Sequence, residues 1–149
     1  MKVNVEMNLS QKDFFDYLTQ SLIIDIFKNT DKFKNTNEIK KGLQYKKKFK
    51  QAGNKELEGN VEIIEYVSPE SYISKIQLNS NISHIGYEIE KIDDDHIRVT
   101  YTETFDSTKK LHVWNYKIIS FILFYFNAKK MKKMLIAMEH HILNKEESI

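Results

Sequence analysis

One long apolar stripe near the C-terminus constrains the fold of this chain more than any other feature. Between residues 111 and 143, apolar residues recur at steps of three and four, which is the spacing of one helical face. The stripe comprises Ile118, Phe121, Tyr125, Ala128, Met131, Leu135, Met138 and Ile142. The lysines of this stretch fall away from it, at Lys129, Lys130, Lys132 and Lys133. A helix over 118–142 is about 37 Å long at 1.5 Å per residue, so the rest of the chain must supply an equally long apolar surface.

The N-terminal part predicts one strand followed by two short helices. Apolar and polar residues alternate over 3–9, which is typical of a half-buried strand. Ser10 then resembles an N-cap, with Asp13 three residues later in a capping-box-like arrangement. Two short apolar faces at helical spacing follow, one over 14–18 and one over 22–27. Residues 29–41 are polar and lack an apolar period, so we expect a loop there.

From Gly42 onwards the apolar period becomes two, which predicts a run of antiparallel strands. We expect these strands over 43–49, 61–67, 72–78, 85–89 and 97–105. The turn Asp93-Asp94-Asp95 decides how the last two pair. If Ile92 pairs with His96 across a three-residue loop, Tyr87 lies opposite Tyr101, and both strands turn their apolar residues to the same side. The order of elements predicts an α+β fold.

Composition bounds the class of protein. A chain of 149 residues is long enough for a single domain with a sizeable core, and we expect one domain over 1–149. There is no cysteine, and the N-terminus has no apolar signal core, so we expect a cytoplasmic protein. The longest apolar run, 118–126, is too short for a membrane span of about 20 residues. The net charge is +2 and Arg98 is the only arginine, so we expect no nucleic-acid partner.

Four stretches carry a resemblance to a known family. They are VEIIEYVSPESY (61–72), GYEIEKIDDD (86–95), RVTYTETF (98–105) and FILFYFNAKKMKKML (121–135). The chain resembles the helix-grip proteins of the START-like (SRPBCC) superfamily, which includes birch-pollen allergen relatives, polyketide cyclases and lipid-transfer domains. More narrowly, it is similar to a bacterial family known as domain of unknown function 3284. The resemblance implies a curved antiparallel sheet wrapped around the C-terminal helix, and it implies no catalytic residue.

The chain lacks the usual patterns of catalytic and metal-binding sites. His140 and His141 are adjacent and would point about 100° apart on a helix, so they do not share one metal ion. There is no cysteine, no serine in a GxSxG motif and no glycine-rich phosphate loop. We therefore expect no metal, no cofactor and no nucleophilic catalysis.

Two charged residues occupy inward positions of their strands, Lys47 between Tyr45 and Phe49, and Glu103 between Tyr101 and Phe105. A charge that points inward is costly unless it is paired or hydrated. Each residue therefore marks either a polar contact inside a cavity or a local bend that brings the charge to water.

The mixture of long aromatic and short or polar inward residues predicts an apolar cavity of a few hundred Å³, in the range of small-molecule sites, between the sheet and the long helix. We expect it to be lined by Tyr45, Phe49, Tyr72, Ile76, Tyr87, Ile89, Tyr101, Glu103, Trp114, Phe121, Met131 and Met138. The favoured function is non-enzymatic binding of a small hydrophobic or amphipathic ligand. Two other functions stay open: docking of the basic C-terminal helix on a membrane surface or a protein, and a cyclase- or hydrolase-like activity with Glu103 as acid or base.

Overall fold

The computed structural model describes the backbone of residues 1–31, 36–50, 54–107 and 113–148. It describes the side chains of the same residues except those of 107 and 113–126. The first elements are β1 (Lys2–Met7), α1 (Gln11–Asn29) and a short 3₁₀ turn, η1 (Thr36–Glu38). Five strands follow: β2 (Gln44–Lys50), β3 (Glu56–Val67), β4 (Ser71–Leu78), β5 (Asn81–Asp93) and β6 (His96–Ser107). The last element is the long helix α2 (Val113–Glu147).

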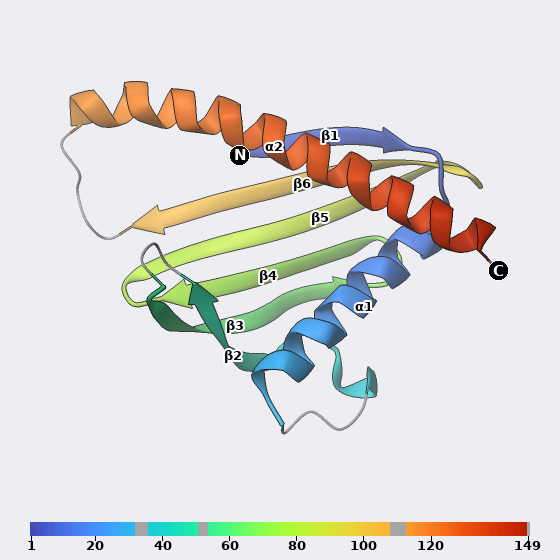
Figure 1. Ribbon diagram of the computed structural model, residues 1–149, viewed down its shortest axis with the longest axis horizontal. Helices are drawn as coiled ribbons and strands as arrows, with labels where there is room; N and C mark the ends of the chain where they lie inside the picture. The colour runs from blue at the N-terminus through green and yellow to red at the C-terminus, as the bar shows by residue number, and fades with distance from the viewer. Residues whose placement is uncertain (32–35, 51–53, 108–112, 149) are drawn as a thin grey trace.

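The strands form one antiparallel sheet in the order β1-β6-β5-β4-β3-β2. Strands β2 to β6 are neighbours both in sequence and in space, whereas β1 crosses to the far edge and pairs with β6. Figure 1 shows the sheet curving, with both helices on its concave side. The predicted α+β architecture, a curved antiparallel sheet with one long C-terminal helix, is therefore confirmed.

The predicted register of the last hairpin is confirmed, but its turn is built differently. Tyr87 pairs with Tyr101, and the same register continues along both strands. However, Asp93 and not Ile92 pairs with His96, and the register shifts between Lys91 and Asp93. The chain makes a tight turn and a bulge in place of the predicted three-residue loop. The bulge absorbs the extra residue, so the apolar faces of β5 and β6 stay on the same side.

The prediction of two short helices after the first strand is wrong, because α1 is one continuous helix of 19 residues. Its buried residues follow steps of one, three and four along the whole length: Phe14, Phe15, Leu18, Leu22 and Ile26. No glycine or proline interrupts them, so the two apolar faces join into one stripe. The predicted cap is confirmed, since the Ser10 hydroxyl accepts a hydrogen bond from the Asp13 backbone N–H at 3.1 Å. The predicted loop over 29–41 contains η1.

Helix α2 begins at Val113, five residues before the predicted start, and its described half packs as expected. Leu135 is 0% exposed and Ile142 is buried, and both pack with residues of β1, β5 and β6. Met131 and Met138 are half-buried against the same cluster. The four lysines over 129–133 are exposed. The apolar stripe therefore attaches α2 to the β1–β6 side of the sheet.

The two helices meet at one end and diverge towards the other. The rings of Tyr17 in α1 and His141 in α2 lie 5.6 Å apart. From there α1 crosses towards β2, where Leu22 and Ile26 pack with Tyr45, Val61 and Ile63, while α2 stays over β1. Figure 1 shows the resulting wedge between the helices, above the middle strands. This divergence positions the candidate site.

Candidate functional site

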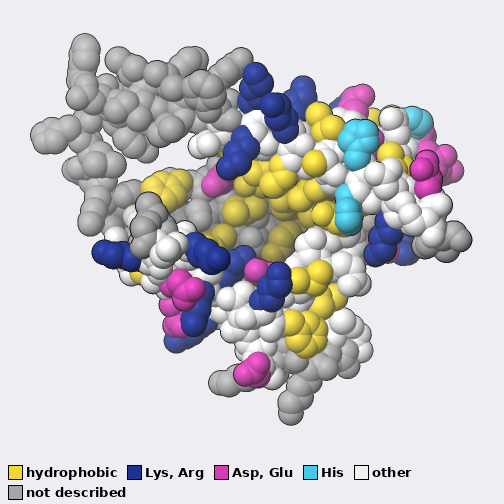
Figure 2. Space-filling view, viewed as in Figure 1, with side chains coloured by type: hydrophobic (Ala, Val, Ile, Leu, Met, Phe, Trp, Pro, Cys, Tyr) yellow, Lys and Arg dark blue, Asp and Glu magenta, His cyan; other side chains and the backbone are white. Residues whose placement is uncertain are grey.

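A hollow on the concave side of the sheet is the candidate site. Figure 2 shows it between the two helices, with hydrophobic side chains gathered in it and charged groups along its margin. We call it the concave groove and define it by inward side chains that stay half-buried or exposed among the described residues. They are Lys47, Phe49, Tyr72, Ile76, Ile85, Glu103 and Phe105 of the sheet and Met131 of α2. Phe105, at 60%, is the most exposed.

A row of four tyrosines crosses the sheet at the deep end of the groove. Tyr66 of β3 lies edge-on to Tyr72 of β4 at 6.5 Å between ring centroids, Tyr72 stacks on Tyr87 at 6.4 Å, and Tyr87 meets Tyr101 edge-on at 5.2 Å. Tyr87 and Tyr101 are buried, whereas Tyr66 and Tyr72 are half-buried. Ring contacts at these separations make the row a closely packed wall.

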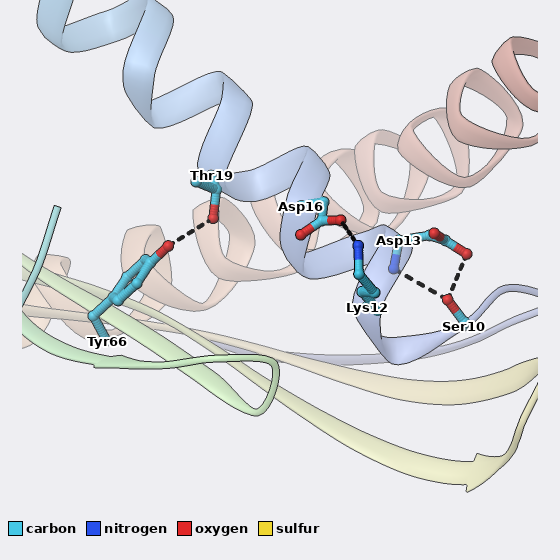
Figure 3. A network of polar contacts seen from close by, with 6 residues as sticks. All are labelled: Ser10, Lys12, Asp13, Asp16, Thr19 and Tyr66. Atoms are coloured by element: carbon cyan, nitrogen blue, oxygen red, sulfur yellow. Dashed lines mark hydrogen bonds and ion pairs between the residues drawn. The ribbon is translucent and has the colours of Figure 1, made fainter. Parts of the chain in front are cut away.

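The hydroxyl groups of this row find partners inside the fold. Tyr66 shares a 3.0 Å hydrogen bond with Thr19, which ties the middle of α1 to the sheet, about two turns beyond the cap at Ser10 (Figure 3). Tyr101 donates a longer bond of 3.4 Å to the Glu103 carboxylate. Burial raises the pKa of Tyr72, of Tyr101 and of Tyr87, to about 12 for Tyr87, so these phenols stay neutral at physiological pH.

The β2 end of the groove holds a half-buried ion pair. The Lys47 ammonium donates a hydrogen bond to Asp25 Oδ1 of α1 at 2.6 Å, and the Tyr45 hydroxyl donates to Asp25 Oδ2 at 2.6 Å. Burial and the bond to Asp25 raise the pKa of Tyr45. The structure shows a third arrangement for the inward Lys47, beside the cavity contact and the local bend that we considered: Asp25 of α1 supplies the opposite charge.

The β6 side of the groove carries Glu103. Its backbone N–H donates to the Met1 carbonyl at 2.8 Å, and its carbonyl accepts from the N-terminal ammonium, so the chain start fixes this part of β6. The Glu103 side chain is half-buried and its carboxylate accepts only the long bond from Tyr101 among the described contacts. A half-buried carboxylate beside the groove is accessible to a ligand, so Glu103 is a candidate polar contact for one.

The predicted site residues divide into three groups. Four are buried in the core, at Tyr45, Tyr87, Ile89 and Tyr101. Six are half-buried, at Phe49, Tyr72, Ile76, Glu103, Met131 and Met138. Trp114 and Phe121 lie outside the residues whose side chains are described. Five of the half-buried residues line the concave groove, and Met138 packs against the core deeper along α2.

The predicted lining lacked several residues of the site, among them Asp25, Tyr66, Ile85 and Phe105. Asp25 lies three residues after Leu22 on the apolar stripe of α1, so its position on that face was the available signal. Tyr66 follows a register shift between Ile63 and Glu65, which reverses the alternation of β3 and turns Tyr66 inward. Ile85 lies two residues before Tyr87 on β5, so both side chains point to the same face of the sheet. The predicted lining could have been extended by one position to include it.

Further cavities among the described residues lie outside the groove, including one of about 590 Å³ lined by residues 37–38 and 40–44. One of about 550 Å³ opens at the β2 edge beside the end of α1, with Ile26, Leu43, Tyr45 and Asn60 among its lining residues. Another of about 240 Å³ lies between α1 and α2, next to Tyr17 and Ile142. Beneath α1, the gap between Phe15, Leu22 and Tyr72 leaves no room for a water molecule. Tyr45 lines the cavity of about 550 Å³ and also bonds to Asp25, the partner of the groove residue Lys47.

The described residues offer no evident metal site, since no group of three or more histidine, aspartate or glutamate side chains gathers among them. Within the same residues, no helix is long and apolar enough to cross a membrane. The chemistry available in the groove is therefore that of aromatic and aliphatic surface, one ion pair and one carboxylate.

Comparisons with known proteins place the fold. A family model described as "Domain of unknown function (DUF3284)" matches residues 1–124. No match was found among curated proteins. The structure is similar to Mll3558 from Rhizobium loti, with 12% identity over 94% of each chain and a TM-score of 0.60.

It is also similar to SA2116 from Staphylococcus aureus, a protein of unknown function, with 14% identity over 100% of this chain and 96% of that chain and a TM-score of 0.57. Ara h 8.0201 matches with 14% identity over 97% of each chain and a TM-score of 0.59. At such identities the likeness shows the fold alone, and it confirms the helix-grip architecture.

Proposed function

Because this chain belongs to the DUF3284 family, whose description assigns no activity, and has a helix-grip fold, we propose from its groove that it binds a small hydrophobic or amphipathic molecule without catalysing a reaction. The observation that carries this proposal is the hollow between α1 and α2, where three inward side chains of β4 and β5, Tyr72, Ile76 and Ile85, stay half-buried while their neighbours Tyr87 and Ile89 are buried. Aromatic and aliphatic groups that are only partly covered provide apolar surface for a ligand.

The groove has the composition of a small-molecule site. Its floor includes the apolar side chains Phe49 of β2, Ile76 of β4 and Ile85 of β5, and Met131 of α2 adds a side chain that adapts to irregular shapes. Charged groups of the described residues stand at its two sides, Lys47 with Asp25 on one and Glu103 on the other. Such sites combine a mostly apolar lining with a few polar groups that orient the ligand.

The test uses a neutral apolar fluorescent probe, N-phenylnaphthylamine, with matched tryptophan variants of α2. Met131→Trp places a larger ring at the groove and should weaken probe binding, whereas Ile136→Trp lies on the exposed side of the same helix and should leave binding unchanged. Circular dichroism would show that both variants stay folded. Absence of probe binding to the natural protein, or equal binding by the two variants, would contradict the proposal.

Native mass spectrometry of the protein purified from its own host would identify a ligand directly. A small molecule that co-purifies with the natural protein and is reduced in Met131→Trp would support binding in the groove. The same molecule retained in full by that variant would place the binding elsewhere.

A second candidate function is docking on an anionic membrane, and one observation favours it. Lys129, Lys130, Lys132 and Lys133 are exposed on α2, and none makes an ion pair with another described residue. Ile136 and Met134 are exposed beside them. A basic helix face with a few apolar side chains is typical of contact with acidic lipid headgroups.

Vesicle binding distinguishes this function from general electrostatic attraction. Changing the four α2 lysines to glutamine should abolish binding to phosphatidylcholine vesicles that contain phosphatidylserine. Changing the exposed Lys12, Lys46, Lys48 and Lys91 to glutamine lowers the net charge equally and should preserve binding, because those lysines are already paired. Equal effects of the two sets would refute specific docking by α2, as would binding that does not fall at high salt.

A further inference from the structure

The half-buried Lys47 is the feature of the groove that points to a particular ligand class. Its side chain is 31% exposed and that of its partner Asp25 is 26% exposed, so the pair lies at the boundary between the core and the groove. We infer that Lys47 binds the acidic head group of an amphipathic ligand, such as a carboxylate on an aliphatic chain. This inference rests on the proposed ligand binding in the groove and adds the chemistry of the head group.

Hydrogen-bond counting supports an acceptor on the ligand. Lys47 has three N–H donors, and the described contacts use one of them, to Asp25 Oδ1. Asp25 Oδ2 already accepts the hydroxyl hydrogen of Tyr45. Both carboxylate oxygens therefore have a donor, whereas two of the three N–H groups of the ammonium have no acceptor among the described residues. A ligand that brings oxygen acceptors satisfies them, and a ligand that brings only donors does not.

The surroundings of Lys47 favour a charged acceptor joined to an apolar chain. Its ammonium lies 5.5 Å from the centroid of the Phe49 ring, and Phe49 packs against the same cluster as Ile76 and Tyr72. The apolar floor therefore begins beside the ammonium. In a partly dry site, a carboxylate makes a shorter and stronger bond to an ammonium than a neutral oxygen does. An acid with an aliphatic tail fits both the charge and the floor.

Asp25 sets the strength of the interaction between Lys47 and an acidic ligand. Changing Asp25 and changing Lys47 should therefore alter the affinity for the acid in opposite directions. Its negative charge neutralises part of the Lys47 charge and opposes a second carboxylate nearby. Asp25→Asn keeps the shape and an oxygen that accepts from Tyr45, and it frees the ammonium for the ligand. This variant should bind an acid more tightly, whereas Lys47→Met should bind it more weakly.

The experiment compares dodecanoic acid with dodecanol, which share a tail and differ in head group, through displacement of N-phenylnaphthylamine at neutral pH. We expect the acid to bind more tightly to the natural protein. Lys47→Met should weaken the acid about tenfold or more and leave the alcohol unchanged, as expected for a lost charge-assisted bond. Lys46→Met is the matched control, since the Lys46 side chain is 76% exposed and belongs to a different ion pair.

Lys47→Met alone leaves Asp25 without its cation and is the variant at risk of misfolding, so Asp25→Asn/Lys47→Met is tested beside it. The double variant should show the same loss of preference for the acid. Equal affinities for acid and alcohol in every variant would overturn the head-group inference and leave groove binding intact. If the natural protein binds neither the probe nor the two compounds, groove binding itself fails, and the inference fails with it.

Discussion

Truncation of Leu135 tests whether the apolar stripe of α2 attaches this helix to the sheet. Leu135 is 0% exposed and packs in the cluster formed by β1, β5, β6 and the start of α1. Leu135→Ala removes buried methyl groups and leaves a cavity, because the neighbouring strands cannot close over it. Substitutions of this kind cost about 2–5 kcal/mol. The alanine itself is a good helix former, so the loss reflects packing and not helix propensity.

The expected loss of stability is large enough to measure by thermal unfolding. For a chain of this length, each kcal/mol lowers the melting temperature by about 2–4 °C, so a loss of about 3 kcal/mol predicts a fall of about 6–12 °C. Urea unfolding followed by circular dichroism gives the free energy independently. Both measurements apply to the full chain with no ligand present.

Ile136 is the matched control, since it neighbours Leu135, has the same number of carbon atoms and is 36% exposed. Ile136→Ala should cost less than about 1 kcal/mol, because little buried volume is lost and alanine favours the helix. Equal losses for the two variants would refute the argument that one face of α2 covers the core. A Leu135→Ala loss below about half a kcal/mol would refute it as well.

Three more predictions address the cap, a close approach between strands, and the tyrosine row. Ser10→Ala removes the acceptor of the Asp13 N–H and should cost about 1 kcal/mol in urea unfolding, while Ser10→Asp should restore most of it. Gly59→Ala would place a methyl group 2.7 Å from Leu78 Cδ2 and 2.9 Å from the Gln77 carbonyl oxygen, so we expect a loss of about 1–3 kcal/mol; an unchanged melting temperature would show that β3 and β4 separate easily. Burial raises the pKa of Tyr87 to about 12 against about 10 when unfolded, so the unfolding free energy should be constant below pH of about 10 and fall as the pH rises towards 12. Absorbance of tyrosinate recorded with the unfolding should then show the buried tyrosines of the row ionising as the chain unfolds, and ionisation of Tyr87 in the folded chain at a pH of about 10 would contradict this expectation.

The parts of the fold that follow from repeating patterns could be predicted from the sequence. The stripe of α2 predicted that Met131, Leu135 and Met138 face the sheet and are buried, and that the lysines over 129–133 fall away from it. Leu135 is buried, the two methionines are half-buried against the core, and the lysines are exposed. The alternation of β5 and β6 fixed the pairing of Tyr87 with Tyr101. These predictions succeeded because each pattern has one period that a whole element must satisfy.

The parts that depend on single irregular residues could not be predicted. The register shift in β3 turns Tyr66 inward against the alternation of its strand, and no residue type there signals a bulge. The unbroken α1 was divided in two because the polar residues between Leu18 and Leu22 interrupted the apparent stripe.

The partner of Lys47 was also out of reach. An inward charge is visible in one strand, but Asp25 lies 22 residues earlier on a helix whose path over the sheet the sequence does not give. The head-group chemistry of the candidate site therefore emerged only when the two elements were placed together.

The position of β1 has a consequence for how the chain assembles during synthesis. Strands β2 to β6 can pair one after another as hairpins, each with contacts close in sequence, and such contacts form quickly. In contrast, β1 pairs Lys2 with Thr102, and its inner face is covered by α2. The strand β1 can therefore reach its final pairing only after β6 and α2 have been synthesised. Until then Val3, Val5 and Met7 form an unpaired apolar edge, the kind of segment that chaperones protect in nascent chains. Pairing of β1 with β6 is thus the step that buries these apolar side chains and removes this exposed strand edge, which lowers the tendency of the chain to aggregate.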